Sequence, residues 1–275
     1  MRRRHLLPVF LFLLPLFSTE ASSQELKSLD LNGITLAYRV IGEGEPLVLL
    51  HGFTQTGDAW QPILDYLAPH YRLIIPDLRG HGRSTNPTGE FTHRQSASDV
   101  FGLLDQLGVE QFKAMGISSG GMTLLHMATT QPQRVDAMVL IGATSYFPEQ
   151  TRVIQRRSHP DSVPPSQVES LGRTHSRGAE QARDLLIQFS AMADSYDDMN
   201  FTPPLLSTIT ASTLIIHGDR DSFFPVAIPV EEYQAIPNSY LWIVPNGGHV
   251  PLLNSTGSRA FLAQTVLAFL ADEWR

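Results

Sequence analysis

The feature that most constrains the fold of this chain is a series of short apolar segments that alternate with amphipathic ones. Six runs of strand length are apolar at nearly every position: PLVLLHG, RLIIPD, FKAMGIS, RVDAMVLIG, STLIIHG and YLWIVP. Continuous runs of this kind are typical of strands buried on both faces of a parallel sheet. The alternation therefore predicts an α/β protein with an open sheet that helices cover on both faces.

The remaining pattern predicts the edge of the sheet and the helices. Residues 26–42 alternate apolar and polar side chains around Asn32-Gly33, a pair typical of a tight hairpin turn, so we expect an antiparallel edge here. Helical periodicity predicts helices at 57–68, 93–108, 120–130, 226–235 and 258–274.

One segment, at about 146–205, breaks this alternation. It contains several prolines and no buried-strand pattern, but its stretch GAEQARDLLIQFSAMA has the periodicity of a helix. We therefore expect a helical cap insertion over the carboxyl edge of the sheet, and not an independent domain. Residues 22–275 are then one α/β domain with this insertion.

The N-terminus has the pattern of an export signal. A basic segment, MRRRH, precedes an apolar run of 12 residues and the small residues of STEASSQ. The run is shorter than the ~20 residues that span a bilayer. We expect residues 1–21 to be a signal peptide, and the mature protein to be exported, soluble and without a membrane span; an uncleaved anchor is the alternative.

Composition excludes several classes of function. The chain has 275 residues, of which 42% are hydrophobic and 17% are charged, as in globular proteins. Its net charge of −7 provides no basic surface for nucleic acid. It contains no Cys, which excludes disulfides, thiol catalysis and cysteine metal sites. No His/Asp/Glu spacing suggests a metal, so we expect neither a metal nor another cofactor.

The stretch GISSG, at residues 116–120, lies between a predicted strand and a predicted helix. A G-x-S-x-G pattern in this setting predicts a nucleophile elbow, in which a strained turn exposes the central serine above the sheet. Ser118 is that central residue. Ser119 follows at the start of the helix, where its backbone N–H can stabilise an oxyanion.

A serine nucleophile needs a base and an acid that orients the base. His249 lies in a Gly-rich loop after the last predicted strand, and we expect it to be the base. Asp221 and Asp219 both follow the preceding strand, at the carboxyl edge where open α/β proteins place their sites. We expect Asp221 to be the acid and Asp219 to shape the turn.

A second oxyanion donor is expected in the loop after the first parallel strand. In this loop His51-Gly52 form the turn, and the backbone N–H of Phe53 is the predicted donor. We expect His51 to be structural.

These motifs together resemble the α/β-hydrolase superfamily, from about Leu26 to the C-terminus with the insertion excepted. The matching stretches are HGF, DLRGHGRS, GISSGG, HGDRDSFFP and GGHVP. The chain is most similar to the cap-bearing branch that includes carboxylesterases, C–C bond hydrolases, enol-lactonases and cofactor-free perhydrolases. One departure is Ser119, where relatives often carry Met or another larger residue.

The resemblance implies a mostly parallel eight-stranded sheet, a helical cap at about 146–205 and the Ser118–His249–Asp221 triad. The implied reaction is hydrolysis of a small-molecule acyl substrate, with a carboxylic ester as the expected bond. C–C, lactone or peroxide chemistry with the same triad stays open, and a non-catalytic binding protein is a remote alternative. Oligomeric state is not indicated.

Two further groups of residues have a structural interpretation. Asp77, His81 and Ser84 of DLRGHGRS resemble a catalytic set, but the glycines between them favour a tight structural turn. The cap segment carries six arginines that could hold an anionic substrate, although a solvated helix face is the preferred interpretation: Arg152, Arg156, Arg157, Arg173, Arg177 and Arg183.

Overall fold

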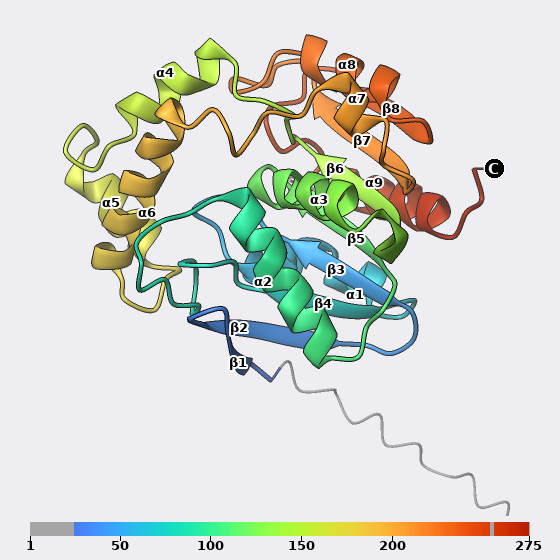
Figure 1. Cartoon of the computed structure of the whole chain (residues 1–275), viewed down its shortest axis with the longest axis horizontal. Helices are drawn as coiled ribbons and strands as arrows, with labels where there is room; N and C mark the ends of the chain where they lie inside the picture. The colour runs from blue at the N-terminus through green and yellow to red at the C-terminus, as the bar shows by residue number, and fades with distance from the viewer. Residues whose placement is uncertain (1–24, 254–255, 275) are drawn as a thin grey trace, which may run out of the picture.

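The computed structural model describes residues 25–253 and 256–274, so the predicted signal peptide lies outside the described residues. The described part contains one eight-stranded sheet in the order β1-β2-β4-β3-β5-β6-β7-β8 (Figure 1). The strands are β1 (Lys27–Leu31), β2 (Ile34–Ile41), β3 (Pro46–Leu50), β4 (Arg72–Pro76), β5 (Phe112–Ile117), β6 (Val135–Ile141), β7 (Ser212–Gly218) and β8 (Ser239–Val244).

The sheet is antiparallel at one edge and parallel elsewhere. β1 pairs antiparallel with β2, and β2 pairs antiparallel with β4. The pairs from β4 through β3, β5, β6 and β7 to β8 are all parallel. At the turn between β1 and β2, Asn32 has φ 49° and Gly33 has φ 75°, the left-handed values that a tight hairpin requires. The predicted mostly parallel sheet with an antiparallel edge is confirmed.

Helices connect the strands. The α-helices are α1 (Leu64–Leu67), α2 (His93–Gln106), α3 (Ser119–Thr130), α4 (Glu149–Arg157), α5 (Pro165–Gly172), α6 (Ala179–Ala191), α7 (Pro203–Leu206), α8 (Ala227–Ala235) and α9 (Thr256–Leu270). Short 3-10 segments are η1 (Gly57–Ile63), η2 (Pro132–Arg134) and η3 (Met192–Asp194).

The predicted helix at 57–68 consists of two short helical segments of different kinds. The stretch 57–68 begins as the 3-10 segment η1 and continues as the single α-helical turn α1. Pro62 lies inside η1 and has no backbone N–H to donate, which disfavours a continuous α-helix through this stretch.

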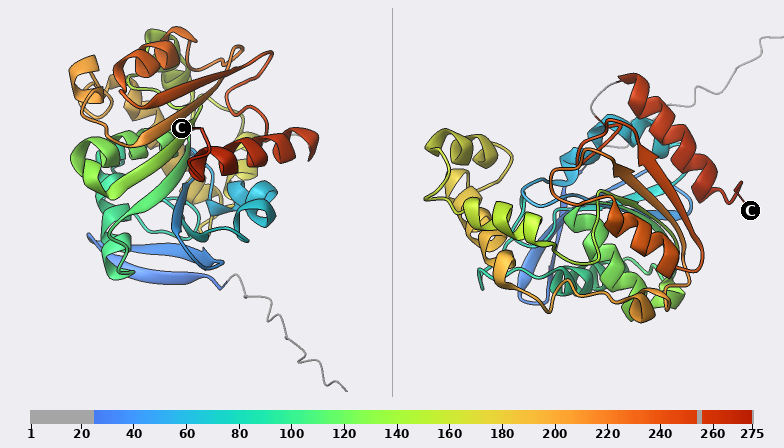
Figure 2. Two further views of the ribbon diagram at one scale, coloured as in Figure 1. Left: turned by 90° about the vertical axis from the view of Figure 1, so that its right-hand side faces the viewer. Right: turned by 90° about the horizontal axis from the view of Figure 1, so that it is seen from above.

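Two apolar clusters lie on the two faces of the sheet. On β3, Val48 and Leu50 pack into a cluster that contains the inner faces of α2 and α3. Leu47 and Leu49 of the same strand pack into a second cluster, which contains α1 and α9. Figure 2 shows these helix pairs on opposite sides of the sheet. The strict alternation along β3 explains why its sequence is apolar at every buried position.

The segment between β6 and β7 carries α4, α5, α6, η3 and α7. In Figures 1 and 2, α4, α5 and α6 extend beyond one end of the sheet as a separate layer. α5 and α6 pack on each other through Val168, Ala182 and Leu186. This layer is joined to the turn after β4 by hydrogen bonds such as the one from Gln181 Nε2 to the carbonyl of Gly80, at 2.8 Å.

Candidate active site

Ser118 lies at a sharp turn between β5 and α3. Its backbone has φ 49° and ψ −115°, in a region that a non-glycine residue rarely adopts. The turn is held on one side by the Ser118 N–H, which donates to the carbonyl of Ile141 at 2.8 Å. On the other side the Ser118 carbonyl accepts from the N–H of Met122 at 2.9 Å and so starts α3. Both bonds hold the strained conformation that the elbow pattern predicts.

The glycines around Ser118 are required by close backbone approach. A Cβ at Gly120 would collide with the carbonyl oxygen of Leu50, at the end of β3. A Cβ at Gly116 would collide with the backbone of Gly120 and Gly121. The turn can therefore fold back over β3 and β5 only with hydrogen at these two positions.

His249 and Asp221 form a hydrogen-bonded chain with Ser118. His249 Nε2 is 3.0 Å from Ser118 Oγ, and His249 Nδ1 is 2.8 Å from Asp221 Oδ2. The Asp221 side chain has no exposed area, whereas about a fifth (21%) of the His249 side chain is exposed. A carboxylate can only accept, so Nδ1–H donates to Asp221 and Nε2 is left to accept the Ser118 hydroxyl proton. The structure thus brings together the three residues that the sequence singled out.

Asp221 is held as a carboxylate by its surroundings. Burial alone raises the pKa of Asp221. The hydrogen bond and charge of His249, with the N–H groups of Phe223 and Phe224 at 2.7 and 3.2 Å from Oδ1, outweigh burial and lower its pKa below the ordinary value. Asp221 is therefore ionised near neutral pH and can stabilise a protonated His249.

The loop after β3, which carries Phe53, is fixed by hydrogen bonds of His51 and Gly52. The N–H of Leu78 donates to His51 Nε2 at 2.9 Å, and His51 Nδ1 is 2.8 Å from the Gly52 carbonyl. His51 is completely buried, in agreement with a structural role. Gly52 and Gln55 close the turn through the Gly52 N–H, which donates to Gln55 Oε1 at 3.0 Å.

A cavity of about 310 Å³ opens at Ser118. Phe53 and Ser119, the two predicted oxyanion donors, line it together with Ser118 and His249. Most of its other walls are apolar and come from the cap segment and from the residues after β7: Phe147, Leu171, Leu186, Phe189, Met192, Phe223 and Phe224. Its volume is at the small end of the usual range for ligand pockets.

A second histidine–aspartate pair lies behind the elbow, and sequence reasoning missed it. His93 Nδ1 is 2.6 Å from Asp198 Oδ2, and His93 Nε2 is 3.1 Å from Ser119 Oγ. Asp198 also accepts from the N–H groups of His93 and Arg94, at 2.8 and 3.1 Å. Burial raises the pKa of Asp198, but these contacts outweigh burial and lower it to about 2.

This pair ties the end of the cap segment to the first turn of α2 and to Ser119. His93 was visible in the sequence only as the start of a helix, and Asp198 belongs to no motif. Asp198 and Arg94 are 104 positions apart in the sequence. Periodicity describes only residues that are close in sequence, so it could not predict this contact.

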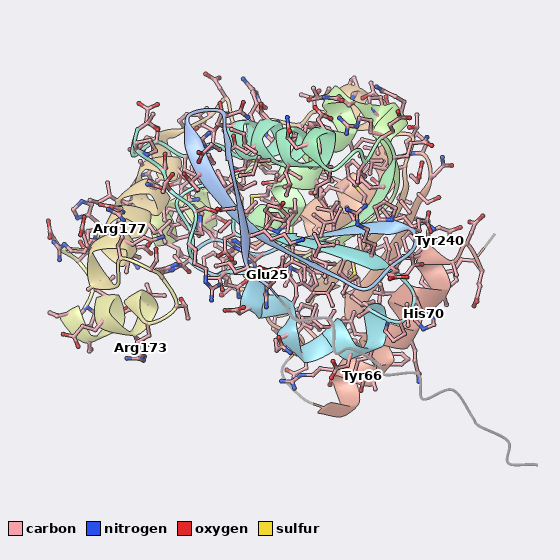
Figure 3. All side chains as sticks on the ribbon, turned by 90° about the horizontal axis from the view of Figure 1, so that it is seen from below. Glu25, Tyr66, His70, Arg173, Arg177 and Tyr240 are labelled. Carbon is pink, nitrogen blue, oxygen red and sulfur yellow. The ribbon has the colours of Figure 1, made fainter. Side chains whose placement is uncertain are left out.

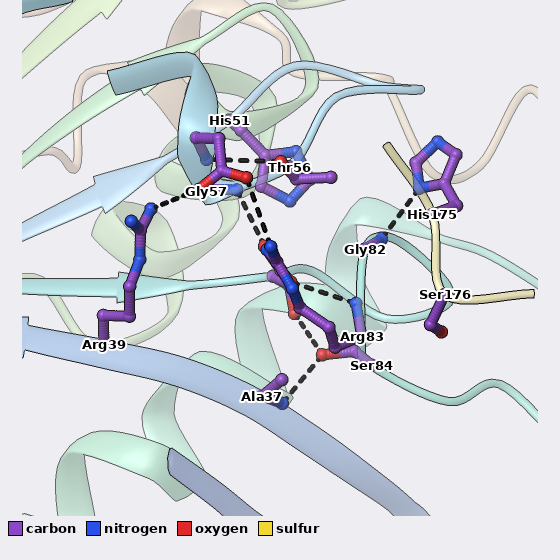
Figure 4. Close-up of polar contacts among 12 residues, drawn as sticks. Ala37, Arg39, His51, Thr56, Gly57, Gly82, Arg83, Ser84, His175 and Ser176 are labelled. Carbon is purple, nitrogen blue, oxygen red and sulfur yellow. Dashed lines mark hydrogen bonds and ion pairs between the residues drawn. The ribbon is translucent and has the colours of Figure 1, made fainter. Parts of the chain in front are cut away.

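Asp77, His81 and Ser84 do not form a second catalytic set. Asp77 Oδ1 accepts from the Gly57 N–H at 2.7 Å, and Oδ2 accepts from the Arg83 N–H at 3.0 Å. The Ser84 hydroxyl donates to the Asp77 carbonyl and accepts from the Ala37 N–H (Figure 4). These groups lock the turn after β4, as the structural interpretation predicts.

The arginines of the cap segment are divided between its surface and its interior. Arg177 pairs with Glu180 and Asp184, and Figure 3 places Arg173 and Arg177 on the outside of this layer. Arg152 departs from the preferred interpretation of a solvated face. It is 5% exposed, and its guanidinium donates to the carbonyls of Phe147, Ala193 and Ser195.

Within the described ranges, no group of three or more His, Asp or Glu side chains could hold a metal ion. None of the helices in these ranges has both the length and the apolar character needed to cross a membrane.

Comparison with known proteins supports the fold and the superfamily. A family profile described as "alpha/beta hydrolase fold" matches residues 45–164. The chain is 29% identical over 243 residues to a pimeloyl-[acyl-carrier protein] methyl ester esterase of Xanthomonas campestris, covering 78% of this chain and 91% of that protein. It is 26% identical over 249 residues to a putative non-heme chloroperoxidase of Synechocystis, covering 78% of this chain and 88% of that protein.

Solved structures agree with these relatives. The crystal structure of a hydrolase from Pseudomonas aeruginosa superimposes with a TM-score of 0.73 and 25% identity, over 90% of this chain and 99% of that one. The elbow, the sheet order and these likenesses lead to one conclusion: the chain has the α/β-hydrolase fold and is similar in sequence and structure to hydrolases of that superfamily.

Proposed function

We propose that this chain is a serine hydrolase that cleaves a carboxylic ester through an acyl-enzyme on Ser118. The observation that most supports the proposal is the hydrogen-bonded chain from Asp221 through His249 to Ser118. Ser118 and His249 line a largely apolar cavity. A base that is oriented by a carboxylate turns a weakly nucleophilic hydroxyl into an effective one.

The proposed reaction proceeds in two halves. His249 Nε2 takes the hydroxyl proton while Ser118 Oγ attacks the ester carbonyl carbon. The N–H groups of Phe53 and Ser119 stabilise the resulting oxyanion, and each lowers the activation free energy by about 3 kcal/mol. His249 then gives the proton to the departing alcohol, and a water molecule that His249 deprotonates hydrolyses the acyl-enzyme. The carboxylic acid is released and Ser118 regains its proton.

Labelling with a fluorophosphonate tests the proposal directly, because the reagent reacts with activated serines. We expect the wild-type protein and Ser119→Ala to be labelled and Ser118→Ala to remain unlabelled. A panel of p-nitrophenyl esters should then show turnover that depends on Ser118. A folded wild-type protein that neither labels nor hydrolyses any ester would contradict the proposal and favour a binding protein on this fold.

Peroxide chemistry is a second candidate, and the likeness to a protein named as a chloroperoxidase favours it. Hydrogen peroxide would replace water in the second half of the reaction and release a peracid from Ser118. The peracid would oxidise bromide to hypobromous acid and return to the carboxylate. Bromination of phenol red in acetate, peroxide and bromide tests this, with Ser118→Ala as the control. A lactone or a C–C bond would require the same triad, and the substrate panel separates these reactions.

A further inference from the structure

The inner face of α4 presents a polar stripe to the cavity. Thr151 and Gln155 lie four residues apart on one side of α4, Ser158 follows directly after its end, and all three line the cavity. The α4 side of the cavity thus carries polar groups among the apolar side chains of the same insertion, such as Phe147, Leu186 and Phe189.

Two members of this stripe are already satisfied. The Thr151 hydroxyl donates to the Phe223 carbonyl at 2.6 Å, and the Ser158 hydroxyl donates to the Ile154 carbonyl at 2.9 Å. Gln155 differs from both. Its side chain is completely buried, and neither Nε2 nor Oε1 has a hydrogen-bond partner among the described residues.

A buried carboxamide without partners destabilises a folded protein, because its donor and its acceptor both lose their hydrogen bonds to water. Leucine or methionine would fill the same space on α4 without that loss. The stability of the folded protein therefore does not explain the amide. Because Gln155 lies on the cavity wall, a hydrogen bond to the substrate would explain it.

The lining of the cavity also restricts the charge of that substrate. In the part of the chain that the structure describes, none of the residues that line it is Asp, Glu, Lys or Arg. A charged group on the substrate would thus be buried without a counter-ion, which is unfavourable. An uncharged group that can both donate and accept would satisfy both atoms of the Gln155 amide.

We propose that Gln155 is a specificity determinant that hydrogen-bonds an uncharged polar group, a hydroxyl or a carboxamide, on a substrate whose scissile carbonyl lies at Ser118. This inference rests on the proposed hydrolase function. The expected substrate is mainly apolar and carries one neutral polar substituent at a distance from the ester.

The test compares p-nitrophenyl esters whose acyl chains have equal lengths and end in a methyl, a primary carboxamide or a carboxylate group. A second series carries the same three end groups on the alcohol side of acetate esters. In the wild-type protein we expect kcat/KM to be about tenfold higher for the carboxamide ester than for the methyl ester at one chain length, as one satisfied hydrogen bond provides. The carboxylate ester should be the poorest substrate at every length.

Gln155→Leu should remove this preference, so that kcat/KM for the carboxamide ester falls to the value for the methyl ester in the same variant. The matched control is Gln167→Leu, the same change at an exposed glutamine that also lines the cavity, and it should keep the preference. The temperature of unfolding is the second readout. Because Gln155→Leu removes an unsatisfied amide, it should unfold at the same or a higher temperature than the wild type.

The outcomes separate this inference from the proposed function. If no chain length shows a preference, or if the preference survives in Gln155→Leu, Gln155 does not select the substrate although the hydrolase proposal stands. A marked fall in the unfolding temperature of Gln155→Leu would assign the amide a structural role instead. If no ester is hydrolysed at all, the proposed function fails and the specificity role fails with it.

Discussion

At the scale of single residues, the site depends on side chains that their neighbours hold in one protonation state. Asp221 shows this most directly, because burial opposes its charge while His249 and two backbone N–H groups restore it. Glu232 shows the opposite outcome. It is completely buried on α8 beside Ser145, and burial raises its pKa to about 8. Two buried carboxyl groups thus differ in charge near neutral pH, because the contacts of Asp221 outweigh burial whereas those of Glu232 do not.

Replacing Asp221 by Asn should lower kcat by about 10⁴-fold, because an amide does not hold His249 in the tautomer that accepts the Ser118 proton. Ester hydrolysis and the rate of fluorophosphonate labelling measure this effect. Asp219→Asn is the matched control, since Asp219 lies two residues away and its nearest ionic contact is Arg220 at 3.9 Å. Equal losses in the two variants would contradict the assignment of Asp221 as the acid.

Glu232→Gln should stabilise the protein at alkaline pH and have little effect near pH 4.5. The folded-state pKa of Glu232 is about 8 against an ordinary value of 4.5, so the unfolded chain releases a proton that the folded chain keeps. Its contribution to stability is therefore complete below pH 4.5 and is lost as the pH rises through 8. At about 1.4 kcal/mol per pKa unit, the gain in Glu232→Gln at pH 8.5 is of the order of a few kcal/mol.

Urea unfolding of this variant at pH 5 and pH 8.5 measures that difference. Glu231→Gln, at an exposed position next in the chain, should show the same stability change at both pH values. A gain in Glu232→Gln that is independent of pH would mean that Glu232 is ionised in the folded protein.

At the scale of elements, the elbow and the cap segment meet through α2. The same Asp198 carboxylate accepts from the first two N–H groups of α2 and from the ring of His93, which contacts Ser119. An acidic group at a helix N-terminus is stabilised by the helix dipole as well as by these hydrogen bonds. The stretch before α7 is thereby fixed against the residue that follows the nucleophile.

We expect Asp198→Ala to lower the free energy of unfolding by about 2–4 kcal/mol, because it leaves a buried imidazole and two N–H groups without their acceptor. Chemical denaturation at pH 7 measures this loss. Asp197→Ala, which changes the exposed neighbour, should be nearly neutral. An equal effect of both variants would show that the buried contacts of Asp198 do not stabilise the fold.

At the scale of the whole molecule, buried histidines set the response to acid. Five of those in the described residues have a pKa below the ordinary 6.5, in each case chiefly because burial disfavours the charged form: His51, His81, His126, His175 and His217. Each stays neutral in the folded protein at a pH where the unfolded chain binds a proton. They lie on several elements, from the loop after β3 to the end of β7.

The free energy of unfolding should therefore fall steeply as the pH drops below about 6.5, since depressed pKa values stabilise the folded state only above the unfolded-state value. Glu232 has the opposite effect, because its raised pKa lowers the free energy of unfolding as the pH rises above 4.5. Maximal stability is therefore expected between about pH 6.5 and 7.5. Urea midpoints from pH 4.5 to 9 measure the profile.

His126, whose pKa is lowered to about 4, provides a matched test of this profile. His126→Gln should reduce the slope between pH 6.5 and 4.5 by about 1.4 kcal/mol per pH unit, while the exposed His70→Gln should leave it unchanged. A stability that stays constant from pH 7 to pH 5 would contradict this account.

The sequence by itself determined the sheet, its antiparallel edge and the positions of Ser118, His249 and Asp221, which the fold brings into hydrogen-bond contact. These features are readable because hydrophobic periodicity and the glycine spacing of a tight turn are local along the chain. Periodicity also predicted a helix at 57–68, but it did not indicate that this helix begins as a 3-10 segment.

Only the tertiary structure decided which polar groups are buried and what they contact. The pairing of His93 with Asp198 and the burial of Arg152 and Glu232 depend on packing between distant segments. The same is true of the Gln155 amide, which has no hydrogen-bond partner among the described residues. A residue type and its neighbours in sequence do not reveal this, because burial is a property of the elements that fold over a side chain. The pattern of the chain therefore predicts where a nucleophile is held, while the shape and polarity of the cavity above it arise only when the segment between β6 and β7 packs against the sheet.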